Sequence, residues 1–232
     1  MRYLVLSDIH ANLEALDAAL AAAGEWDAAL VLGDLVGYGA DPNAVIDRVQ
    51  SLPNATIIRG NHDKVGAGIE TVESFNHLAR HAISWTATEL TPANRDWVAA
   101  MRAGPALIDD LVEICHGSPF DEDAYIFDDL DARRGLVSSQ RPLCLYGHTH
   151  VPAIFKFDGE LSAIGPPRGP RHRLTLDPNA KYLINCGAVG QPRDGDPRAA
   201  FGLFDTESRT LTVLRVPYDV TTAQAKIIAA GL

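Results

Sequence analysis

Short apolar runs alternate with helical patterns over the first sixty residues, and this alternation constrains the fold more than any other feature. The runs at 2–7, 28–33 and 55–60 have the length and composition of buried strands. The segments at 12–24 and 41–52 space their apolar residues along one helical face. Strands linked through helices pair in parallel, so their functional loops gather beyond the carboxyl ends. We therefore expect a parallel sheet at the start of the chain.

The second half of the chain favours antiparallel strands instead. A mainly helical segment at about 66–104 is followed by predicted hairpins with turns at 109–110 and 158–159. Further apolar runs and a last helix complete the sequence, and no internal repeat or Ser/Gly linker divides it. We predict one domain over 1–232 with an α/β fold, a four-layer αββα sandwich of two mixed sheets flanked by helices.

The charge and hydropathy of the chain exclude several classes of protein. A net charge of −10 disfavours binding to long nucleic acid or to an anionic membrane. No window of about twenty apolar residues is present to span a bilayer, and the amino-terminal apolar run is too short for a secretory signal. Three cysteines without C-x-x-C spacing predict buried free thiols. We expect a cytoplasmic protein.

Histidine, aspartate and asparagine residues follow five predicted strands at their carboxyl ends. Taken alone, His148 and His150 would also fit a turn with two surface histidines. Random placement of eight histidines seldom produces five such strand ends, and imidazole with carboxylate is a donor set of transition-metal sites. We therefore predict a site that collects Asp8, His10, Asp34, Asn61, His62, Asp63, His116, His148 and His150.

Five segments in this part of the sequence form an ordered series: "SDIHAN", "LGDLVGYG", "RGNHD", "CHGSP" and "GHTHVP". In order and spacing they resemble the motifs of the calcineurin-like metallophosphoesterases. The later segment "GAVGQPRDGDPRA" is similar to one found in a branch of small bacterial single-domain phosphodiesterases. The resemblance covers roughly 1–200 and implies a two-sheet sandwich with a dinuclear metal centre.

Carried over by position, the resemblance implies seven metal ligands. One ion would be bound by Asp8, His10 and His150, the other by Asn61, His116 and His148, and Asp34 would bridge the two. In such a centre a hydroxide that bridges the ions attacks the phosphorus. The cofactors would be two divalent transition-metal ions, with manganese as the first candidate and iron, zinc, nickel or cobalt as alternatives.

The resemblance also implies two catalytic residues. His62 would lie beside the scissile phosphate, where its imidazolium stabilises developing charge or protonates the leaving oxygen. Asp63 would orient His62 and raise its pKa, or else only cap the following turn.

Three residues are candidate substrate contacts. Arg59 would contact phosphate or form a salt bridge that holds its loop, and Tyr38 would stack on a nucleobase or pack under its own loop. Arg193 follows a strand that should end near the metals and would reach the substrate phosphate. Where the family pattern reads "NPGSVG", this chain reads "NCGAVG" with Cys186 and Ala188, which leaves a hydroxyl contact from this loop open.

The leading functional hypothesis is a metal-dependent phosphoric ester hydrolase, a phosphodiesterase rather than a monoesterase. Its substrate would be a small phosphorylated molecule, such as a cyclic nucleotide or a dinucleoside polyphosphate. The alternatives are a protein serine/threonine phosphatase and a non-catalytic metal-binding scaffold or ligand sensor. A lid formed by 66–104 would disfavour phosphoproteins, and intact motifs disfavour the scaffold. An exposed sheet edge would allow a homo-oligomer.

Overall fold

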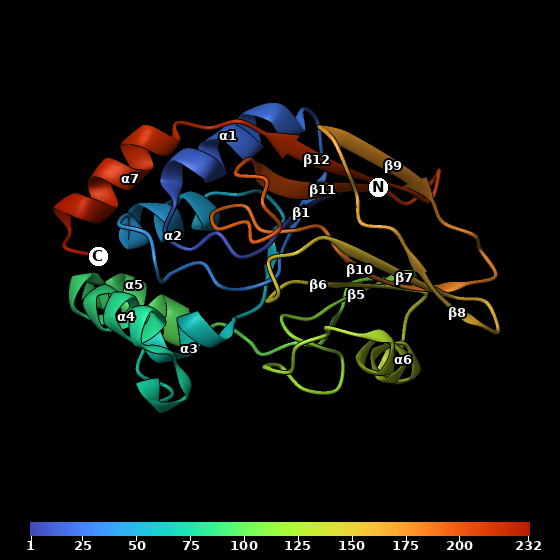
Figure 1. Ribbon diagram of the computed structural model, residues 1–232, viewed down its shortest axis with the longest axis horizontal. Helices are drawn as coiled ribbons and strands as arrows, with labels where there is room; N and C mark the ends of the chain where they lie inside the picture. Colours follow the sequence, from blue (N-terminus) through green and yellow to red (C-terminus); the bar gives the residue numbers. More distant parts are fainter.

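Two mixed six-stranded sheets lie face to face in the computed structural model, which describes residues 1–232 (Figure 1). The first sheet has the order β3 (Thr56–Ile57), β2 (Ala28–Val31), β1 (Arg2–Leu6), β11 (Ala199–Asp205), β12 (Thr210–Val216) and β9 (Arg171–Thr175). The second has the order β4 (Ala106–Leu107), β5 (Val112–Ile114), β6 (Leu143–Tyr146), β10 (Lys181–Asn185), β7 (Ala153–Phe157) and β8 (Leu161–Ile164). This arrangement, with helices outside both sheets, confirms the predicted four-layer α/β fold.

The helices cover the outer faces of both sheets and one end of the sandwich. On the first sheet lie α1 (Leu13–Ala23) and α2 (Pro42–Gln50), and α7 (Val220–Ala229) packs against α1, while α6 (Asp129–Ser138) packs on the second sheet (Figure 1). At the end of the sandwich lie α3 (Asn61–Gly66), the 3₁₀ turn η1 (Val72–Ser74), α4 (His77–Glu89) and α5 (Pro92–Ala99). None of these helices combines the length and the apolar character needed to cross a bilayer.

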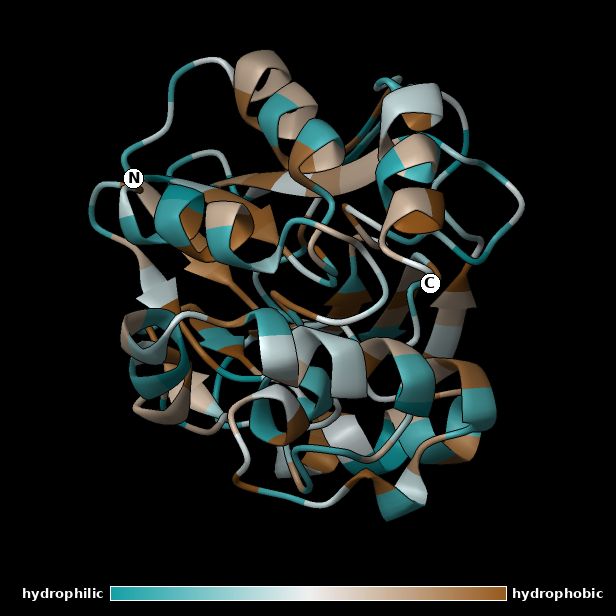
Figure 2. Ribbon diagram, turned by 90° about the vertical axis from the view of Figure 1, so that its left-hand side faces the viewer, coloured by the Kyte–Doolittle hydropathy of each residue, from teal (hydrophilic) through white to brown (hydrophobic).

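Side chains alternate between the two faces of each central strand and so fill three separate layers of core. Along β1, Leu4 and Leu6 pack toward the outer helices, whereas Tyr3 and Val5 pack between the two sheets. A third apolar cluster lies between the second sheet and α6 and contains Cys144. In Figure 2 the strands are largely brown, and teal residues gather on the helices and loops around them. Burial on both faces explains why the strands appear as continuous apolar runs in the sequence.

Each sheet contains three parallel strands whose carboxyl ends point to the same end of the molecule. These are β1, β2 and β3 in the first sheet and β5, β6 and β10 in the second. The loops after β1 and β10 are joined by hydrogen bonds from Val189 N to Ser7 O (2.9 Å) and from Gly190 N to Asp8 O (3.0 Å). The predicted ligand loops of both sheets therefore meet at one place.

Three local predictions differ from the structure. The strand predicted at 55–60 covers only Thr56–Ile57, and Ile58 forms only an isolated bridge with Arg102. The sequence pattern did not reveal α6, whose one buried face includes Gly135; a Cβ at Gly135 would lie 2.9 Å from Leu183 Cδ2. The segment predicted as mainly helical at about 66–104 is divided into η1, α4 and α5.

Candidate metal centre and substrate cleft

The carboxyl ends of the parallel strands surround a cleft with a volume of about 360 Å³. Several predicted site residues line it, namely Asp34, Tyr38, Asn61, His62, His148, His150 and Arg193. Asp8, His10 and His116 lie deeper and are almost completely buried. The structure therefore brings all seven predicted metal ligands to one region, with part of the set open to the cleft.

The first group of potential ligands consists of Asp8, His10, Asp34 and His150, with one donor atom from each within 4.8 Å of the others. His10 Nδ1 lies 3.0 Å from the Val36 carbonyl and His150 Nδ1 lies 2.7 Å from the Gln191 carbonyl. Because a carbonyl oxygen only accepts hydrogen bonds, both rings carry their proton on Nδ1 and a lone pair on Nε2.

The two Nε2 atoms of this group lie only 3.0 Å apart. His150 Nε2 also lies 3.5 Å from Asp8 Oδ1, and His10 Nε2 lies 3.5 Å from Asp34 Oδ2. Buried lone pairs and carboxylate oxygens that converge in this way repel one another unless a cation lies among them. The donor set of the first group thus fits a divalent metal ion.

The second group consists of Asp34, His116 and His148, and the side chain of Asn61 joins it. His116 Nδ1 lies 2.8 Å from the Leu32 carbonyl, which leaves Nε2 facing Asn61 Oδ1 at 3.2 Å. His148 is held in the opposite sense, because its Nε2 lies 3.0 Å from the Asp123 carbonyl. Its Nδ1 is therefore the nitrogen left for a ligand, and this group also fits a metal ion.

Asp34 belongs to both groups through a single oxygen. Its Oδ2 lies 3.5 Å from His10 Nε2 and 3.5 Å from His116 Nε2. Its Oδ1 accepts a hydrogen bond from His62 N at 2.9 Å. The carboxylate is thus fixed with one oxygen directed between the two histidine sets, as a shared ligand requires.

The loops that present these side chains adopt unusual backbone conformations. Asp8, His10, Asp34, His148 and His150 all have positive φ, between 49° and 67°. A non-glycine residue in this region costs roughly 1–3 kcal/mol, so surrounding structure must impose it. At His148 the Asp8 carboxylate does so by accepting the backbone N–H at 3.0 Å. Strain concentrated on predicted ligands indicates a site built for function.

Gly60 allows the loop after β3 to approach the shared carboxylate closely. A Cβ at this position would lie 2.2 Å from Asp34 Oδ1 and 2.7 Å from His116 Cε1. Such distances are far below van der Waals contact, so a larger residue would displace one of these two side chains. The glycine before Asn61 is therefore a requirement of the site itself.

Burial and charge move the pKa values of the cluster in different directions. Burial lowers the pKa of His10 well below its ordinary value and lowers that of His148 to about 3. Burial also disfavours the cation of His116, but the Asp34 carboxylate outweighs it and raises the pKa to about 10. Burial disfavours the Asp34 anion in turn, yet the facing histidines hold its pKa well below the usual range. A metal ion in the second group would compete with the proton of His116.

The structure corrects the expected relation between His62 and Asp63. The Asp63 carboxylate accepts backbone hydrogen bonds from Leu35 N (2.9 Å), Val36 N (3.2 Å) and Gly60 N (2.9 Å) and makes none with His62. Burial, followed by the charge of Asp34, raises the pKa of Asp63 to about 7. Burial lowers the pKa of His62 to about 4. Asp63 thus joins two ligand loops and neither orients His62 nor raises its pKa.

His62 lies on the wall of the cleft beside the first ligand group, with 4.8 Å between its ring centroid and that of His10. It is 5% exposed, lines the cleft, and its Nδ1 has no hydrogen-bond partner. Its ring is in contact with those of Tyr38 (4.7 Å between centroids) and Phe75 (4.6 Å). At Gly37 a Cβ would lie 2.3 Å from His62 Nδ1, so this glycine gives the ring its space.

Arg59 is not in contact with the cleft, and the structure corrects its expected role as a substrate contact. Its guanidinium forms two hydrogen bonds to Glu122, at 3.1 and 3.3 Å. Glu122 also pairs with Lys64, a buried lysine on α3. Although burial disfavours the ammonium, hydrogen bonds with Asp123 and Glu70 raise the pKa of Lys64 above its ordinary value. The salt bridge that holds the loop is thus the observed arrangement.

Arg193 and Tyr38 both border the cleft. Arg193 is exposed and hydrogen-bonds to Gln191 Oε1 (2.8 Å) and to Tyr38 Oη (3.4 Å). The nearby carboxylates of Asp194 and Asp196 pair instead with Arg215, which is buried. The Arg193 guanidinium therefore keeps its charge free for an anion in the cleft.

Several cleft residues were not predicted from the sequence. Phe75 packs on His62, and Tyr125 stacks on His148 with 3.8 Å between ring centroids. Glu70 and Asp123 also line the cleft. The only available signal was the aromatic and acidic composition around these positions, which does not distinguish a cleft from an ordinary surface.

The loop "NCGAVG", which departs from the family pattern, lies beneath the turn that carries His148 and His150 and outside the cleft lining. Cys186 and Ala188 are buried and do not line the cleft, and burial raises the pKa of the Cys186 thiol to about 12. Asn185, at the end of β10, donates hydrogen bonds to Gly147 O (2.7 Å) and Thr149 Oγ1 (3.1 Å). The loop thus holds the turn that carries His148 and His150.

Comparison with known proteins agrees with this geometry. The model of the calcineurin-like phosphoesterase superfamily domain matches residues 1–209. An uncharacterised protein of Methanocaldococcus jannaschii, MJ0912, is 33% identical over 233 aligned positions, and the alignment covers 97% of this chain and 90% of that protein.

Solved structures give the same result. The crystal structure of a metallophosphoesterase from Sphaerobacter thermophilus is 36% identical with a TM-score of 0.89, over 100% of this chain and 95% of that one. The hypothetical protein PH1004 from Pyrococcus horikoshii has the same fold, with 19% identity and a TM-score of 0.79 over 100% and 94% of the two chains. With a family model that matches most of its length, the chain belongs to the calcineurin-like phosphoesterase superfamily.

Proposed function

We propose that this protein is a dimetal phosphoesterase that hydrolyses small phosphodiesters or nucleotides, of the cyclic nucleotide or dinucleoside polyphosphate type. The observation that carries the proposal is the pair of ligand groups that share Asp34 Oδ2. Within each group a backbone carbonyl holds one nitrogen of each histidine, so the other nitrogen faces the interior of the group. This arrangement favours two cations side by side over a structural role for the histidines.

The seven predicted ligands would divide between two ions. Asp8, His10 and His150 would hold the first, Asn61, His116 and His148 the second, and Asp34 both. When bound, such a pair supplies Lewis acidity toward a phosphoryl oxygen and lowers the pKa of water. The mixed nitrogen and oxygen donors make manganese the first candidate, with iron, zinc, nickel and cobalt as alternatives.

Residues of the cleft would act on the substrate. His62 lines the cleft, and its ring would donate a hydrogen bond to the leaving oxygen or stabilise charge on the phosphoryl group. Arg193 would bind a phosphate oxygen outside the metal centre. Tyr38 lines the cleft and would stack on the nucleobase of a nucleotide substrate.

The shape of the cleft supports a small substrate. Residues of the segment 66–104, including Phe75, form part of its lining, and we propose that this segment acts as a lid within a single domain 1–232. A volume of about 360 Å³ suits a nucleotide better than a phosphoprotein, which disfavours the protein phosphatase. A net charge of −10 disfavours long nucleic acids for the same site.

The test is metal-dependent hydrolysis by protein stripped with a chelator. Manganese, iron, cobalt, nickel and zinc are restored singly, and aryl monoesters, aryl diesters, cyclic nucleotides and dinucleoside polyphosphates are assayed. We expect diester or polyphosphate hydrolysis that returns with metal and falls in H62A. Phosphopeptide hydrolysis at a comparable rate would favour the protein phosphatase. Metal binding without turnover of any substrate would favour the scaffold or sensor.

A further inference from the structure

Lys64 is a buried lysine surrounded by three carboxylates near the second ligand group. Its side chain is 1% exposed, and Nζ lies 2.9 Å from Glu70, 3.2 Å from Glu122 and 2.5 Å from Asp123. An acidic cluster of this kind would resemble a cation site, but the lysine ammonium already provides the charge. The cluster is therefore an ion-pair network between α3 and the segment 121–123.

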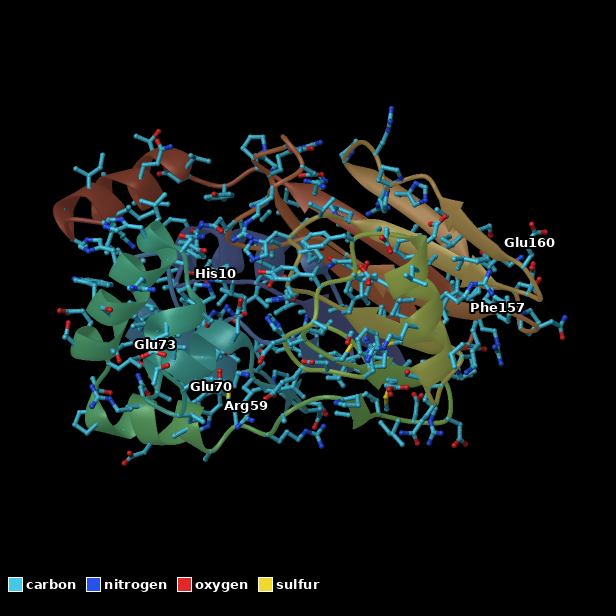
Figure 3. All side chains as sticks on the ribbon, turned by 60° about the horizontal axis from the view of Figure 1, so that its bottom comes forward. His10, Arg59, Glu70, Glu73, Phe157 and Glu160 are labelled. Carbon is cyan, nitrogen blue, oxygen red and sulfur yellow. The ribbon has the colours of Figure 1, made fainter.

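Arg59 strengthens the same connection. It binds Glu122 through two hydrogen bonds, and together with Lys64 it flanks Asn61 and His62 in the sequence. The short segment that carries two predicted functional residues is thus bound on both sides to one acidic segment. Figure 3 shows Arg59 and Glu70 close together at the helical end of the molecule.

The acidic segment makes one contact with a predicted metal ligand. The Asp123 carbonyl accepts a hydrogen bond from His148 Nε2 at 3.0 Å, and Tyr125, two residues later, stacks on the same ring. A histidine has two neutral tautomers, and its partner decides which nitrogen carries the proton. As long as the Asp123 carbonyl stays in place, His148 carries its proton on Nε2 and offers Nδ1 to an ion.

We propose that Lys64 is a positioning residue that fixes the tautomer of His148 through Asp123 and so prepares the second metal site. The inference rests on the proposed function, because it assigns a ligand role to His148. Without the ammonium, three neighbouring carboxylates repel one another, and the segment 121–125 moves away from the histidine. His148 then samples both tautomers, and the second ion loses a preorganised ligand.

The first experiment uses metal-free protein and does not depend on activity. Long-range ¹H–¹⁵N spectra of the imidazoles should show His148 protonated on Nε2 in the wild type and exchanging between tautomers in Lys64→Met. Lys64→Arg should retain the wild-type signal because it keeps the charge. Lys156→Met is the matched control, since Lys156 also pairs with two aspartates. It precedes Phe157, which lies at the opposite end of the molecule from Arg59 (Figure 3).

The second experiment measures binding of each ion by calorimetry and the steady-state kinetics. In Lys64→Met the dissociation constant of the second ion should rise about 10–100-fold, with the first ion unchanged, and kcat should fall while KM stays constant. If Lys64→Met does not fold, Asp123→Ala is measured instead, because it removes the half-exposed carboxylate that pairs with Lys64 and keeps the backbone carbonyl. The same exchange between His148 tautomers is expected in this variant. An unchanged His148 tautomer in Lys64→Met would overturn the inference.

Wild-type protein that binds no metal would instead contradict the proposed function. In that case the tautomer measurement would still decide the role of Lys64.

Discussion

The two ligand groups differ in the structures that hold their histidines. In the first group, His10 and His150 donate to the carbonyls of Val36 and Gln191, in loops at the carboxyl ends of the strands. In the second group, His148 donates to Asp123, whose side chain is 43% exposed, in a segment outside both sheets. The sandwich alone therefore builds the first group, whereas the second also depends on the ion pairs that the buried Lys64 makes with the segment 121–123.

The difference indicates that the two sites respond differently to mutation. A site held by buried backbone changes only when the core or a ligand changes. A site whose histidine is fixed through an outer segment loses affinity when that segment moves. We expect the first ion to bind more tightly and the second to be the one that is lost when the protein is perturbed.

Asp34→Ala should have the largest effect, because it removes the oxygen shared by both groups. Metal-assisted stabilisation of the transition state is worth several kcal/mol, so kcat/KM should fall by about a thousandfold or more. Both ions should be lost in metal analysis of the purified protein. Asp17→Ala, which breaks a surface ion pair with Arg48, is the control and should retain both ions and full activity. A variant that still held two ions would show that Asp34 is not shared.

Gly60→Ala should disturb both ligand groups, because the new side chain would displace Asp34, which belongs to both. The new Cβ would overlap Asp34 Oδ1 and crowd His116, so we expect a loss of about 1–3 kcal/mol in the free energy of unfolding. Displacement of the reacting groups by about 1 Å can reduce activity by roughly a hundredfold. Gly165→Ala provides the comparison, since nothing lies within 4 Å of its Cβ. Wild-type activity in Gly60→Ala would mean that the site tolerates displacement of the bridging carboxylate.

Asp63→Asn should lower the affinity of the first ligand group for its ion without changing any of the predicted ligands. Above pH 7 the Asp63 carboxyl is ionised, because its pKa is about 7, and three backbone N–H groups then lose a charged acceptor in the variant. A buried hydrogen bond to a charged group contributes about 1.5–3 kcal/mol. Because Val36 also accepts the His10 hydrogen bond, the affinity of the first ion should decrease with the stability. Thermal unfolding with and without manganese measures both quantities. A decrease in the affinity of the second ion alone would contradict our assignment.

Arg193→Ala should have the smallest effect, because the side chain is exposed and contacts no ligand of either ion. Loss of one exposed, charge-assisted contact to substrate should raise KM by about five- to tenfold with little change in kcat. Metal content should be unchanged. Arg193→Lys should recover part of the affinity, and an unaltered KM in Arg193→Ala would remove the residue from the substrate site.

The positions of the ligands could be predicted from the sequence because each follows an apolar strand. Strand ends in a parallel sheet converge, so Asp8 and Asp34 could be placed together without coordinates, whereas His116 was added to them through the family resemblance. The hydrogen bonds of Asp63 and Lys64 could not be predicted in this way. They join residues that are distant in sequence, and the local pattern of each is compatible with an ordinary cap or surface charge.

Helix α6 and the residues that line the cleft were harder to predict from the sequence, because tertiary contacts determine them as well. Gly135 lies in the middle of α6 and weakens its helical pattern, yet it is needed there because Leu183 packs against it. Phe75 and Tyr125 lie outside regular helices and strands, so no periodicity marks them. Features set by tertiary contacts alone were therefore the ones that the sequence did not reveal.

The central claim is that two ions bind side by side and share Asp34. Titration of metal-free protein with Mn²⁺, followed by electron paramagnetic resonance, tests it directly. We predict two ions per chain with the spectrum of a spin-coupled pair, and a single uncoupled ion in His148→Ala. One ion per chain in the wild type, or two ions without coupling, would contradict the account.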